Sequence, residues 1–361
     1  MRKVAIIAFG LEHCRRGVET HARMLFENLA HEGEFQVTLI KGSGSRNGSE
    51  VVLSVPKRHT MLNRFLGRLR GYDIYWEQVF FMIRLAFHLL GNRYDVLYTQ
   101  EYVHLIGIGK LKKWLGWNTR IVYCEGFVSH IETRTKYADI LQEVNASNYQ
   151  FIQPLAMDKG VDVRLIPHFF DPISDTRSAL EHDVLRELEH FTKDYRTILY
   201  VGPTELPEKN FEKLQRAFIS LDLEWRMIIC GDVPEERILL LDPTGERLKT
   251  CYVNHATMQR IYPMADVFIL PSLEEAFGIA TLEAMGHGIP VLLHDNQHSR
   301  WLSGDEEQCI DMTREGSIGR FLQHVTDWTA YKELKGRMNQ EHFMKTFTWE
   351  CLREKYLELF R

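Results

Sequence analysis

The chain has 361 residues, of which 45% are hydrophobic and 26% charged, and its formal net charge at pH 7 is −5. This length predicts two domains, and the weakly acidic balance gives no reason to expect a nucleic-acid partner. The six cysteines are scattered without Cys-x-x-Cys spacing, which argues against a disulfide framework or a zinc site and favours a reducing, cytoplasmic compartment.

The stretch MRKVAIIAFG at the start contains only a short apolar run, so we expect a first strand there and not a signal peptide. The best candidate for a membrane span, VFFMIRLAFHLL, is interrupted by Arg84 and His88. We therefore expect a cytoplasmic protein that does not span a membrane.

The first 40 residues are patterned as one βαβ unit, with strands at 4–9 and 35–40 and a helix at 18–33. The loop at 10–17 lacks the Gly-x-Gly-x-x-Gly spacing of a dinucleotide site, which argues against a dehydrogenase. Gly17 allows the backbone to approach a ligand or simply makes a tight turn, and the residues do not decide between the two.

The segment 57–70 is basic and amphipathic, with five cations, no acidic residue and its apolar side chains on one helical face. This composition suits peripheral contact with the anionic inner face of a membrane, or a lipid-phosphate acceptor. The alternative, which we favour, is a domain helix whose basic side faces solvent.

Strand patterns at 96–99, 121–124 and 163–166 complete the first half, and the polar segment after residue 172 is expected to be a linker. The second half repeats the alternation of strand and helix. The fold class is therefore α/β, with two Rossmann-like, doubly wound parallel-sheet domains facing a central cleft. The strands of the second half are expected at 197–202, 225–231, 251–254, 267–270 and 290–295. The predicted divisions are 1–172, 173–335, and a C-terminal helical segment, 336–361, that packs back on the first domain.

The most informative stretch is PSLEEAFGIATLEAMGHGIP at 271–290, which follows the strand at 267–270. A glycine turn opening into a helix N-terminus suits a phosphate, because unpaired backbone N–H groups and the helix dipole meet there. Glu275 and Glu283 would repel a phosphate but suit sugar hydroxyls. The combination predicts a nucleotide-sugar site.

Four stretches in order, YVGPTELPEKNFEKLQRAF, RMIICGDVPEE, PSLEEAFGIATLEAMGHGIPV and FTWE, resemble the GT-B-fold retaining glycosyltransferases, particularly family 4 of the "glycosyl transferases group 1" type. The resemblance is strongest in the C-terminal half and covers nearly the full length more loosely. It implies a nucleotide-diphosphate sugar as donor substrate, a hydroxyl acceptor (a glycan, a lipid-linked molecule or a small molecule) and no cofactor.

The resemblance also assigns residues along the glycine turn. Glu275 would take the hydroxyls of the transferred sugar, and the backbone amides of Phe277, Gly278 and Ile279 would hold the diphosphate. Glu283 would take the ribose hydroxyls.

Three further residues belong to the same donor site by this resemblance. Gly202 and Gly231 end two strands beside it. Lys209 would balance the charge of the leaving diphosphate in a low-dielectric cleft. The base would stack near 252–257.

Several positions depart from the family pattern. The arginine expected after Gly202 is Pro203 here, so a second diphosphate cation is missing or comes from elsewhere, such as Arg15 or Arg16. The double glycine of the N-terminal loop is reduced to Arg16-Gly17, the residues expected to line that acceptor-side phosphate loop.

Two more departures concern the reacting centre. Glu125 stands where the family has a histidine, and it is either a catalytic group that positions the acceptor hydroxyl or a buried, hydrogen-bonded carboxylate. His130 lies close by but out of register. The Gly-Gly pair expected after 290–295 is replaced by Asn296-Gln297-His298.

The chain contains no Asp-x-Asp pair, so we expect no metal; amides and Lys209 would take its place. The resemblance implies retention of anomeric configuration, with the leaving phosphate helping to deprotonate the incoming hydroxyl. Two alternatives stay open: a nucleotide-sugar epimerase on the same fold, and a catalytically weak sugar-nucleotide binding protein. The sequence does not identify the sugar, the nucleotide, the acceptor or the oligomeric state.

Overall fold

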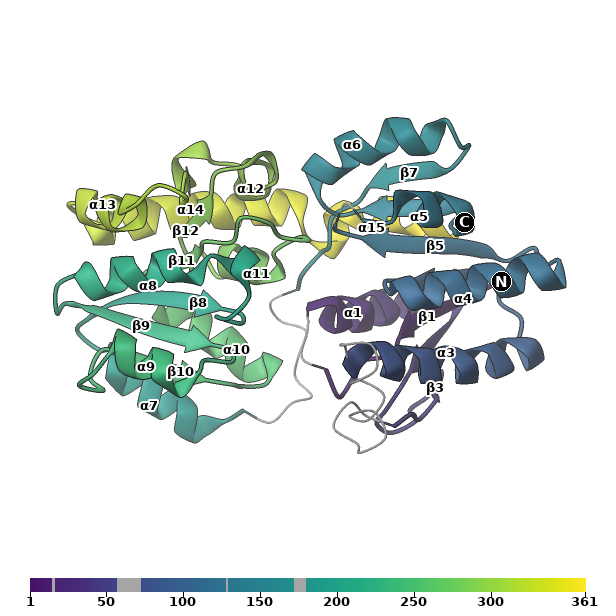
Figure 1. Cartoon of the computed structure of the whole chain (residues 1–361), viewed down its shortest axis with the longest axis horizontal. Coiled ribbons are helices and arrows are strands. Elements are labelled where there is room, and N and C mark those ends of the chain that lie inside the picture. Colours follow the sequence, from purple (N-terminus) through teal and green to yellow (C-terminus); the bar gives the residue numbers. More distant parts are fainter. Residues whose placement is uncertain (15–16, 57–72, 128, 172–179) are drawn as a thin grey trace. The chain divides into compact units, whose positions relative to one another are not determined.

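A computed structural model describes residues 1–14, 17–56, 73–127, 129–171 and 180–361 (Figure 1). It divides into two compact units. The first unit comprises Met1–His168 with Leu352–Arg361, and the second unit comprises Phe169–Cys351. Arg15, Arg16 and the basic segment 57–70 lie outside the described residues.

The first unit is built on a seven-stranded parallel sheet with the order β3-β2-β1-β4-β5-β6-β7. Its strands are β1 (Arg2–Ala8), β2 (Phe35–Lys41), β3 (Glu50–Val52), β4 (Val96–Thr99), β5 (Arg120–Glu125), β6 (Ile140–Glu143) and β7 (Asp162–Leu165). The strand order reverses beside β1, which is the doubly wound topology. Its helices are α1 (Gly17–Glu32), α3 (Asp73–Gly91), α4 (Tyr102–Leu115), α5 (Ile131–Tyr137) and α6 (Ala146–Met157).

The last helix, α15 (Trp349–Phe360), belongs to the first unit from Leu352 onward. Its Tyr356 is buried, and the hydroxyl donates a hydrogen bond to the carbonyl of Pro167 over 2.8 Å. Further along the helix, the ring of Phe360 packs 5.9 Å from that of Tyr98 on β4. These contacts bury one side of the C-terminal helix against the first sheet.

The second unit contains a six-stranded parallel sheet with the order β10-β9-β8-β11-β12-β13. Its strands are β8 (Arg196–Val201), β9 (Trp225–Cys230), β10 (Leu248–Cys251), β11 (Val267–Leu270), β12 (Val291–His294) and β13 (Cys309–Ile310). The longer helices around it are α7 (His182–Thr192), α8 (Phe211–Ser220), α11 (Ile279–Gly286), α13 (Ser317–His324) and α14 (Trp328–Thr346). The shorter ones are η1 (Pro207–Lys209), α9 (Glu235–Leu241), α10 (His255–Ile261), η2 (Tyr262–Met264), α12 (Gln297–Ser303) and η3 (Glu306–Gln308).

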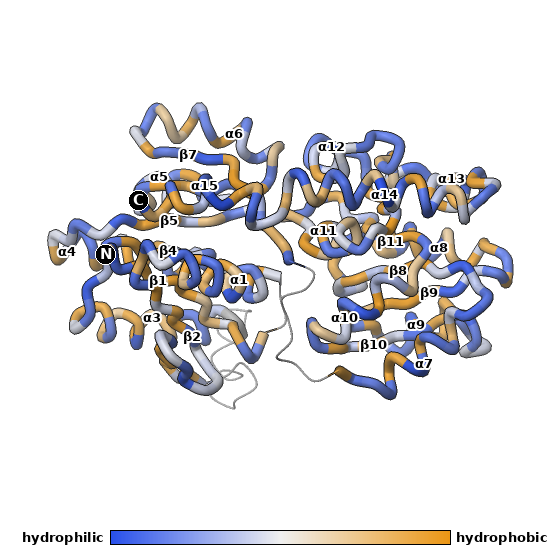
Figure 2. The backbone as a smooth tube through the Cα atoms, turned by 180° about the vertical axis from the view of Figure 1, so that it is seen from behind, coloured by the Kyte–Doolittle hydropathy of each residue, from blue (hydrophilic) through white to orange (hydrophobic). Residues whose placement is uncertain are grey.

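Continuous apolar runs form the central strands of both sheets, because helices on the two faces of a parallel sheet bury every side chain. In β1 every residue from Val4 to Ala8 is buried, and in β9 the run Met227–Cys230 is buried. The tube in Figure 2 is correspondingly orange along β9. Among the described residues, we find no helix that combines the length and the apolar character needed to cross a bilayer.

The predicted α/β class with two doubly wound parallel sheets is confirmed. The position of one predicted strand was wrong, and three strands were not predicted. The strand expected at 251–254 is β10, Leu248–Cys251; Asn254 instead caps α10, its side chain accepting from the amide of Thr257 over 2.9 Å. The missed strands are β3, β6 and β13. β6 was hidden because its last two residues, Gln142 and Glu143, are polar although buried.

Candidate functional site

The donor residues predicted from the sequence follow strands of the second sheet. Gly202 follows β8, Gly231 follows β9, and the turn containing Glu275 follows β11. These strands are neighbours or next-neighbours in a parallel sheet, so their carboxyl ends share one edge, where α/β proteins usually bind ligands. The fold therefore brings three separate sequence motifs to one edge.

Gly202 and Gly231 hold two of these loops against each other. Gly202 has a φ of +141°, which favours glycine, and its amide donates to the carbonyl of Cys230 over 3.0 Å. A Cβ on Gly231 would lie 2.2 Å from the Gly202 carbonyl oxygen. Both glycines are thus required by the packing of the protein itself.

The loop between β8 and α8 is fixed to the segment that follows β11. The amide of Leu273 donates to the carbonyl of Glu208 over 2.9 Å, and the Asn210 side-chain amide donates to the carbonyl of Pro271 over 3.2 Å. At the other end of the loop, the Tyr200 hydroxyl donates to the carbonyl of Pro203 over 2.7 Å. These bonds position Lys209, at the end of η1, beside the glycine turn.

Lys209 and Glu275 form an ion pair at this edge. The Lys209 ammonium donates to Glu275 Oε1 over 2.6 Å, and the two side chains are 20% and 19% exposed. The pair orients both charges while leaving them accessible to solvent. Sequence reasoning placed both residues in the donor site, but it did not predict that they contact each other.

The N-terminus of α11 completes this edge. Gly278 precedes the helix with a φ of +89°, and the first amides of an α-helix have no acceptor within the helix. The Phe277 side chain is buried, and it packs against Trp301 and Phe347. The buried ring of Phe277 therefore fixes the turn to the protein interior. Glu275, the acidic partner of the ion pair, lies two residues before it in the sequence.

His298 also positions this turn, although sequence reasoning noted it only as a departure from the family. Its Nε2 donates to the carbonyl of Phe277 over 2.8 Å, and burial lowers the pKa of the imidazole. A neutral ring protonated on Nε2 satisfies this contact. Asn296, from the same departure, caps α12, because its side chain accepts from the amide of Ser299 over 2.9 Å.

Glu283 lies inside α11 and is buried among protein hydrogen-bond donors. Its Oε2 accepts from the Tyr262 hydroxyl over 2.6 Å, and its Oε1 accepts from the side-chain amide of Gln259 over 3.3 Å. His255 Nδ1 lies 3.3 Å from the same Oε1. Burial raises the pKa of the Glu283 carboxyl against the opposing effects of His255 and Tyr262. Both oxygens thus have protein partners, and the ribose role stays a prediction.

Arg237 supplies a second cation near the loop that contains Pro203, and sequence reasoning missed it. Its Nη2 lies 3.0 Å from the carboxylate of Glu205 in that loop, and its Nη1 donates to the side-chain oxygen of Gln215 over 3.0 Å. The guanidinium also lies over the ring of Phe211. The sequence GDVPEER could have indicated this position for Arg237. A helix that starts shortly after the end of β9 has its first turn at the same edge of the sheet.

Glu125 and Gly17 belong to the first unit. Glu125 ends β5, where its Oε2 accepts from the Tyr123 hydroxyl over 2.7 Å and its Oε1 accepts from the amide of Gly126 over 3.0 Å. The carboxylate is half-buried and orders its own loop, and its acceptor role stays a prediction. Gly17 is the first residue of α1. His130 stacks on Tyr102, with ring centroids 4.4 Å apart.

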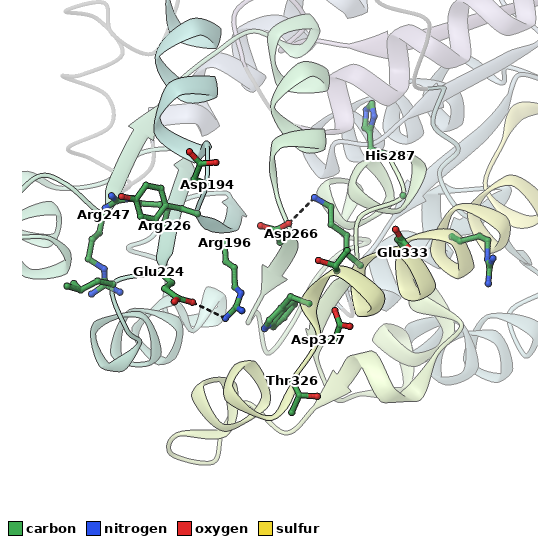
Figure 3. A pocket seen from close by; sticks show the side chains of 18 of the residues that line it. Asp194, Arg196, Glu224, Arg226, Arg247, Asp266, His287, Thr326, Asp327 and Glu333 are labelled. Carbon is green, nitrogen blue, oxygen red and sulfur yellow. Dashed lines mark hydrogen bonds and ion pairs between the residues drawn. The ribbon is translucent and has the colours of Figure 1, made fainter.

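A hollow of about 1410 Å³ in the second unit contains none of the predicted site residues. It lies at the opposite edge of the sheet, where β8, β9 and β11 begin, and Figure 3 shows charged side chains around it. Lys332 pairs with Asp266 over 3.0 Å, and Arg196 pairs with Glu224 over 3.5 Å. These two ion pairs are formed within the protein, and we do not assign the donor to this hollow.

A comparison with known protein families matches most of the second unit. Residues 183–340 match the family "Glycosyl transferases group 1", and this range includes every donor residue named above. The chain is 36% identical over 108 residues to an uncharacterized glycosyltransferase of Methanocaldococcus jannaschii, covering 28% of this chain and 27% of that protein. It is 29% identical over 165 residues to O-antigen chain mannosyltransferase B of Escherichia coli, covering 42% of each. The chain thus spans less than half the length of these two relatives.

Two solved structures show the same fold over the whole chain. Sucrose-phosphate synthase of Thermosynechococcus elongatus has a TM-score of 0.76 at 16% identity and covers 100% of this chain and 98% of its own. Anabaena HepE in complex with UDP-glucose has a TM-score of 0.71 at 13% identity and covers 99% of each chain. These neighbours confirm the predicted GT-B fold.

Proposed function

We propose that the protein is a retaining glycosyltransferase that moves a sugar from a nucleotide-diphosphate sugar to a hydroxyl acceptor without a metal ion. The observation that carries this proposal is the Lys209–Glu275 ion pair at the carboxyl edge of the second sheet, beside the N-terminus of α11. This edge offers a cation, a carboxylate and helix-terminal amides within the segment that matches the glycosyltransferase family.

The diphosphate would lie between Lys209 and the amides of Phe277, Gly278 and Ile279. A helix N-terminus and an ammonium group both favour an anion, and their effect is larger where water is excluded. Arg237 offers further positive charge near the Pro203 loop. These groups would stabilise the negative charge that develops on the leaving diphosphate. In metal-dependent enzymes a bound metal ion stabilises such charge.

The transferred sugar would lie against Glu275. An ionised carboxylate is only a hydrogen-bond acceptor, so it suits sugar hydroxyls and not phosphate oxygens. When a diphosphate engages Lys209, the carboxylate exchanges part of its ion pair for hydroxyl donors. The ion pair thus holds both side chains ready before the donor arrives, and little reorganisation is needed afterwards.

The acceptor hydroxyl would approach the same face of the sugar that the diphosphate leaves. A leaving phosphate oxygen would take the proton of this hydroxyl, which gives retention without a protein nucleophile. Glu125 is our candidate for positioning the hydroxyl, and Glu283 for binding the ribose. The mannosyltransferase relative acts on an O-antigen chain by its name. A glycan or lipid-linked acceptor, handled in the cytoplasm with peripheral membrane contact through 57–70, is therefore the first class to test.

The test is to incubate the protein with a panel of labelled nucleotide sugars and hydroxyl acceptors, in the presence and absence of EDTA. We expect acceptor-dependent release of a nucleoside diphosphate, EDTA resistance, and a product with the anomeric configuration of the donor by NMR. Interconversion of the donor sugar without an acceptor would identify an epimerase instead. Tight donor binding without turnover across the panel would identify a binding protein. Loss of turnover in EDTA would overturn the metal-free mechanism.

A further inference from the structure

Two cysteine side chains lie in contact at the edge of the second sheet. Cys230 ends β9 and Cys251 ends β10, and the two residues are direct partners in the parallel register of these strands. Their sulfur atoms are 3.0 Å apart. β10 is the outermost strand on this side of the sheet, so the pair joins an edge strand to its neighbour.

We propose that Cys230 and Cys251 are a redox modification site that a hydroperoxide oxidises to a reversible disulfide. Neighbouring strands lie about 4.8 Å apart in the hydrogen-bonding direction. Disulfides tolerate Cα separations of roughly 4.4–6.8 Å. In-register partners on adjacent strands therefore fall within the range that a disulfide needs, and the two sulfurs already face each other.

The two thiols differ in a way that suits sequential oxidation. Cys230 is 7% exposed, whereas Cys251 is half-buried and reachable from solvent. The hydrogen bond between the two sulfurs lowers the pKa of the Cys251 thiol. A more accessible and more acidic thiol is the one that a peroxide attacks first. Cys251 is thus the reacting residue and Cys230 the resolving one.

The oxidation balances with one hydroperoxide. The Cys251 thiolate attacks one peroxide oxygen, the O–O bond breaks, and the leaving oxygen takes a proton; Cys251 becomes a sulfenic acid and the peroxide is reduced. The Cys230 sulfur then loses its proton and attacks the Cys251 sulfur, and the hydroxyl leaves as water. With hydrogen peroxide the sum is two thiols and one peroxide giving one disulfide and two waters. A dithiol reverses the reaction by exchange.

The buried cysteines Cys124 and Cys309 lack the lowered thiol pKa of Cys251. Burial raises the pKa of Cys124 to about 12 and that of Cys309 to about 11, so neither is a thiolate near neutral pH. Cys309 contacts a serine hydroxyl, Ser303, at 3.5 Å. They therefore serve as internal controls for the reactivity of the pair.

A disulfide between Cys230 and Cys251 would lie at the same sheet edge as the predicted donor residues. The amide of Gly231 donates to the carbonyl of Cys251 over 3.0 Å, and the segment 252–257, predicted to lie near the base, follows directly. A disulfide would fix the end of the edge strand and change the affinity for a nucleoside diphosphate. This functional consequence rests on the proposed function, whereas formation of the disulfide does not.

The test uses the full-length protein with Cys351→Ser, which removes an exposed thiol. After treatment with hydrogen peroxide, we expect two fewer titratable thiols, a non-reduced peptide that links Cys230 to Cys251, and full reversal by dithiothreitol. The oxidised protein should have a higher Tm that returns on reduction, because the bond closes a loop between positions 21 residues apart. The variant with Cys309→Ser added should behave identically.

Adding Cys230→Ser should stop the reaction at a sulfenic acid on Cys251, which dimedone traps. The proposal is overturned if both thiols stay titratable in the folded Cys351→Ser protein, or if the linked peptides contain other cysteines. Peptide mapping of the peroxide-treated wild type gives the same answer if a variant folds poorly. A chain that forms this disulfide but binds no nucleoside diphosphate in either redox state would contradict the proposed function and leave the redox site standing.

Discussion

The two units share a doubly wound parallel sheet but use its carboxyl edge differently. In the first unit, charged side chains near the ends of β1 and β2 pair with one another: Glu12, Arg23, Lys41 and Glu50. Lys41 is 1% exposed, and its ammonium lies 2.6 Å from Glu50 Oε2. In the second unit, the Lys209–Glu275 pair is about one-fifth exposed and lies beside a helix N-terminus. The same architecture therefore carries a network anchored by the buried Lys41–Glu50 pair in one unit and a partly exposed pair suited to a ligand in the other.

If the polar groups buried in the first unit are structural, removing one partner should cost stability. Glu143→Leu should destabilise the fold by about 3–5 kcal/mol, because it leaves the Arg134 guanidinium charged, buried and unpaired. Urea denaturation measures this loss. Asp162→Ala, which removes the exposed partner of Arg164, should cost less than about 1 kcal/mol. Equal losses in the two variants would contradict the distinction between buried and exposed pairs.

If the pair in the second unit serves a ligand, its removal should reduce activity and spare the fold. Glu275→Ala should lower the transfer rate by on the order of 10²–10³-fold, because a preorganised group at the sugar is lost. Turnover and thermal unfolding are measured together. Glu274→Ala changes the exposed neighbouring glutamate and should retain wild-type turnover. Wild-type turnover by Glu275→Ala would refute the assignment of this residue.

The glycines at the carboxyl edge of the second unit test how closely its two loops pack. Gly231→Ala should destabilise the fold by about 1–3 kcal/mol, because the new Cβ would collide with the carbonyl oxygen of Gly202. Gly319→Ala is the matched control, since its Cβ would meet only the Ser220 hydroxyl at 3.7 Å within a helix. We expect that change to be neutral or stabilising by up to about 1 kcal/mol. A stable Gly231→Ala protein would show that the loops can separate.

A buried pair of histidines makes the first unit sensitive to acid. The rings of His21 and His168 lie 3.9 Å apart, and burial lowers the pKa of His168 to about 3 and that of His21 well below its usual value. Both rings are neutral in the folded protein but protonate near pH 6.5 when unfolded. Their contribution to stability is therefore complete above pH 6.5 and is lost as the pH falls toward 3.

Below pH 6.5 each of these histidines should lower the unfolding free energy by about 1.4 kcal/mol per pH unit. His168→Gln should remove one such contribution from the slope, measured by urea denaturation between pH 7.5 and 5. Parallel slopes in wild type and His168→Gln would contradict a neutral, buried His168.

The sequence was sufficient to predict the strands whose apolar runs are continuous. The strands at 96–99 and 267–270 were predicted to the residue, because side chains buried on both faces leave a clear pattern. β6 was not predicted because its buried Glu143 is polar, and its burial depends on an ion pair with Arg134 that the local sequence does not reveal. β3 and β13, at three and two residues, are too short to show a period.

For the candidate site, the motifs were predictable and the contacts were not. The order of the motifs along a parallel sheet is enough to place Gly202, Gly231 and Glu275 at one edge. The ion pair between Lys209 and Glu275 joins residues 66 positions apart and depends on how two loops pack. The role of His298 likewise arises from a tertiary contact that no local pattern encodes. Arg237 could have been placed near this edge, because its helix follows Gly231 directly.

The most direct test is calorimetric titration of nucleoside diphosphates into the full-length protein in the presence of EDTA. We predict that at least one diphosphate binds without metal, more tightly than its monophosphate, and that Lys209→Met weakens this binding by about tenfold or more. Lys213→Met, which changes a nearby lysine paired with Glu315, should bind as the wild type does. Binding that requires a divalent cation, or that is unaffected by Lys209→Met, would contradict a donor site built on Lys209 and Glu275.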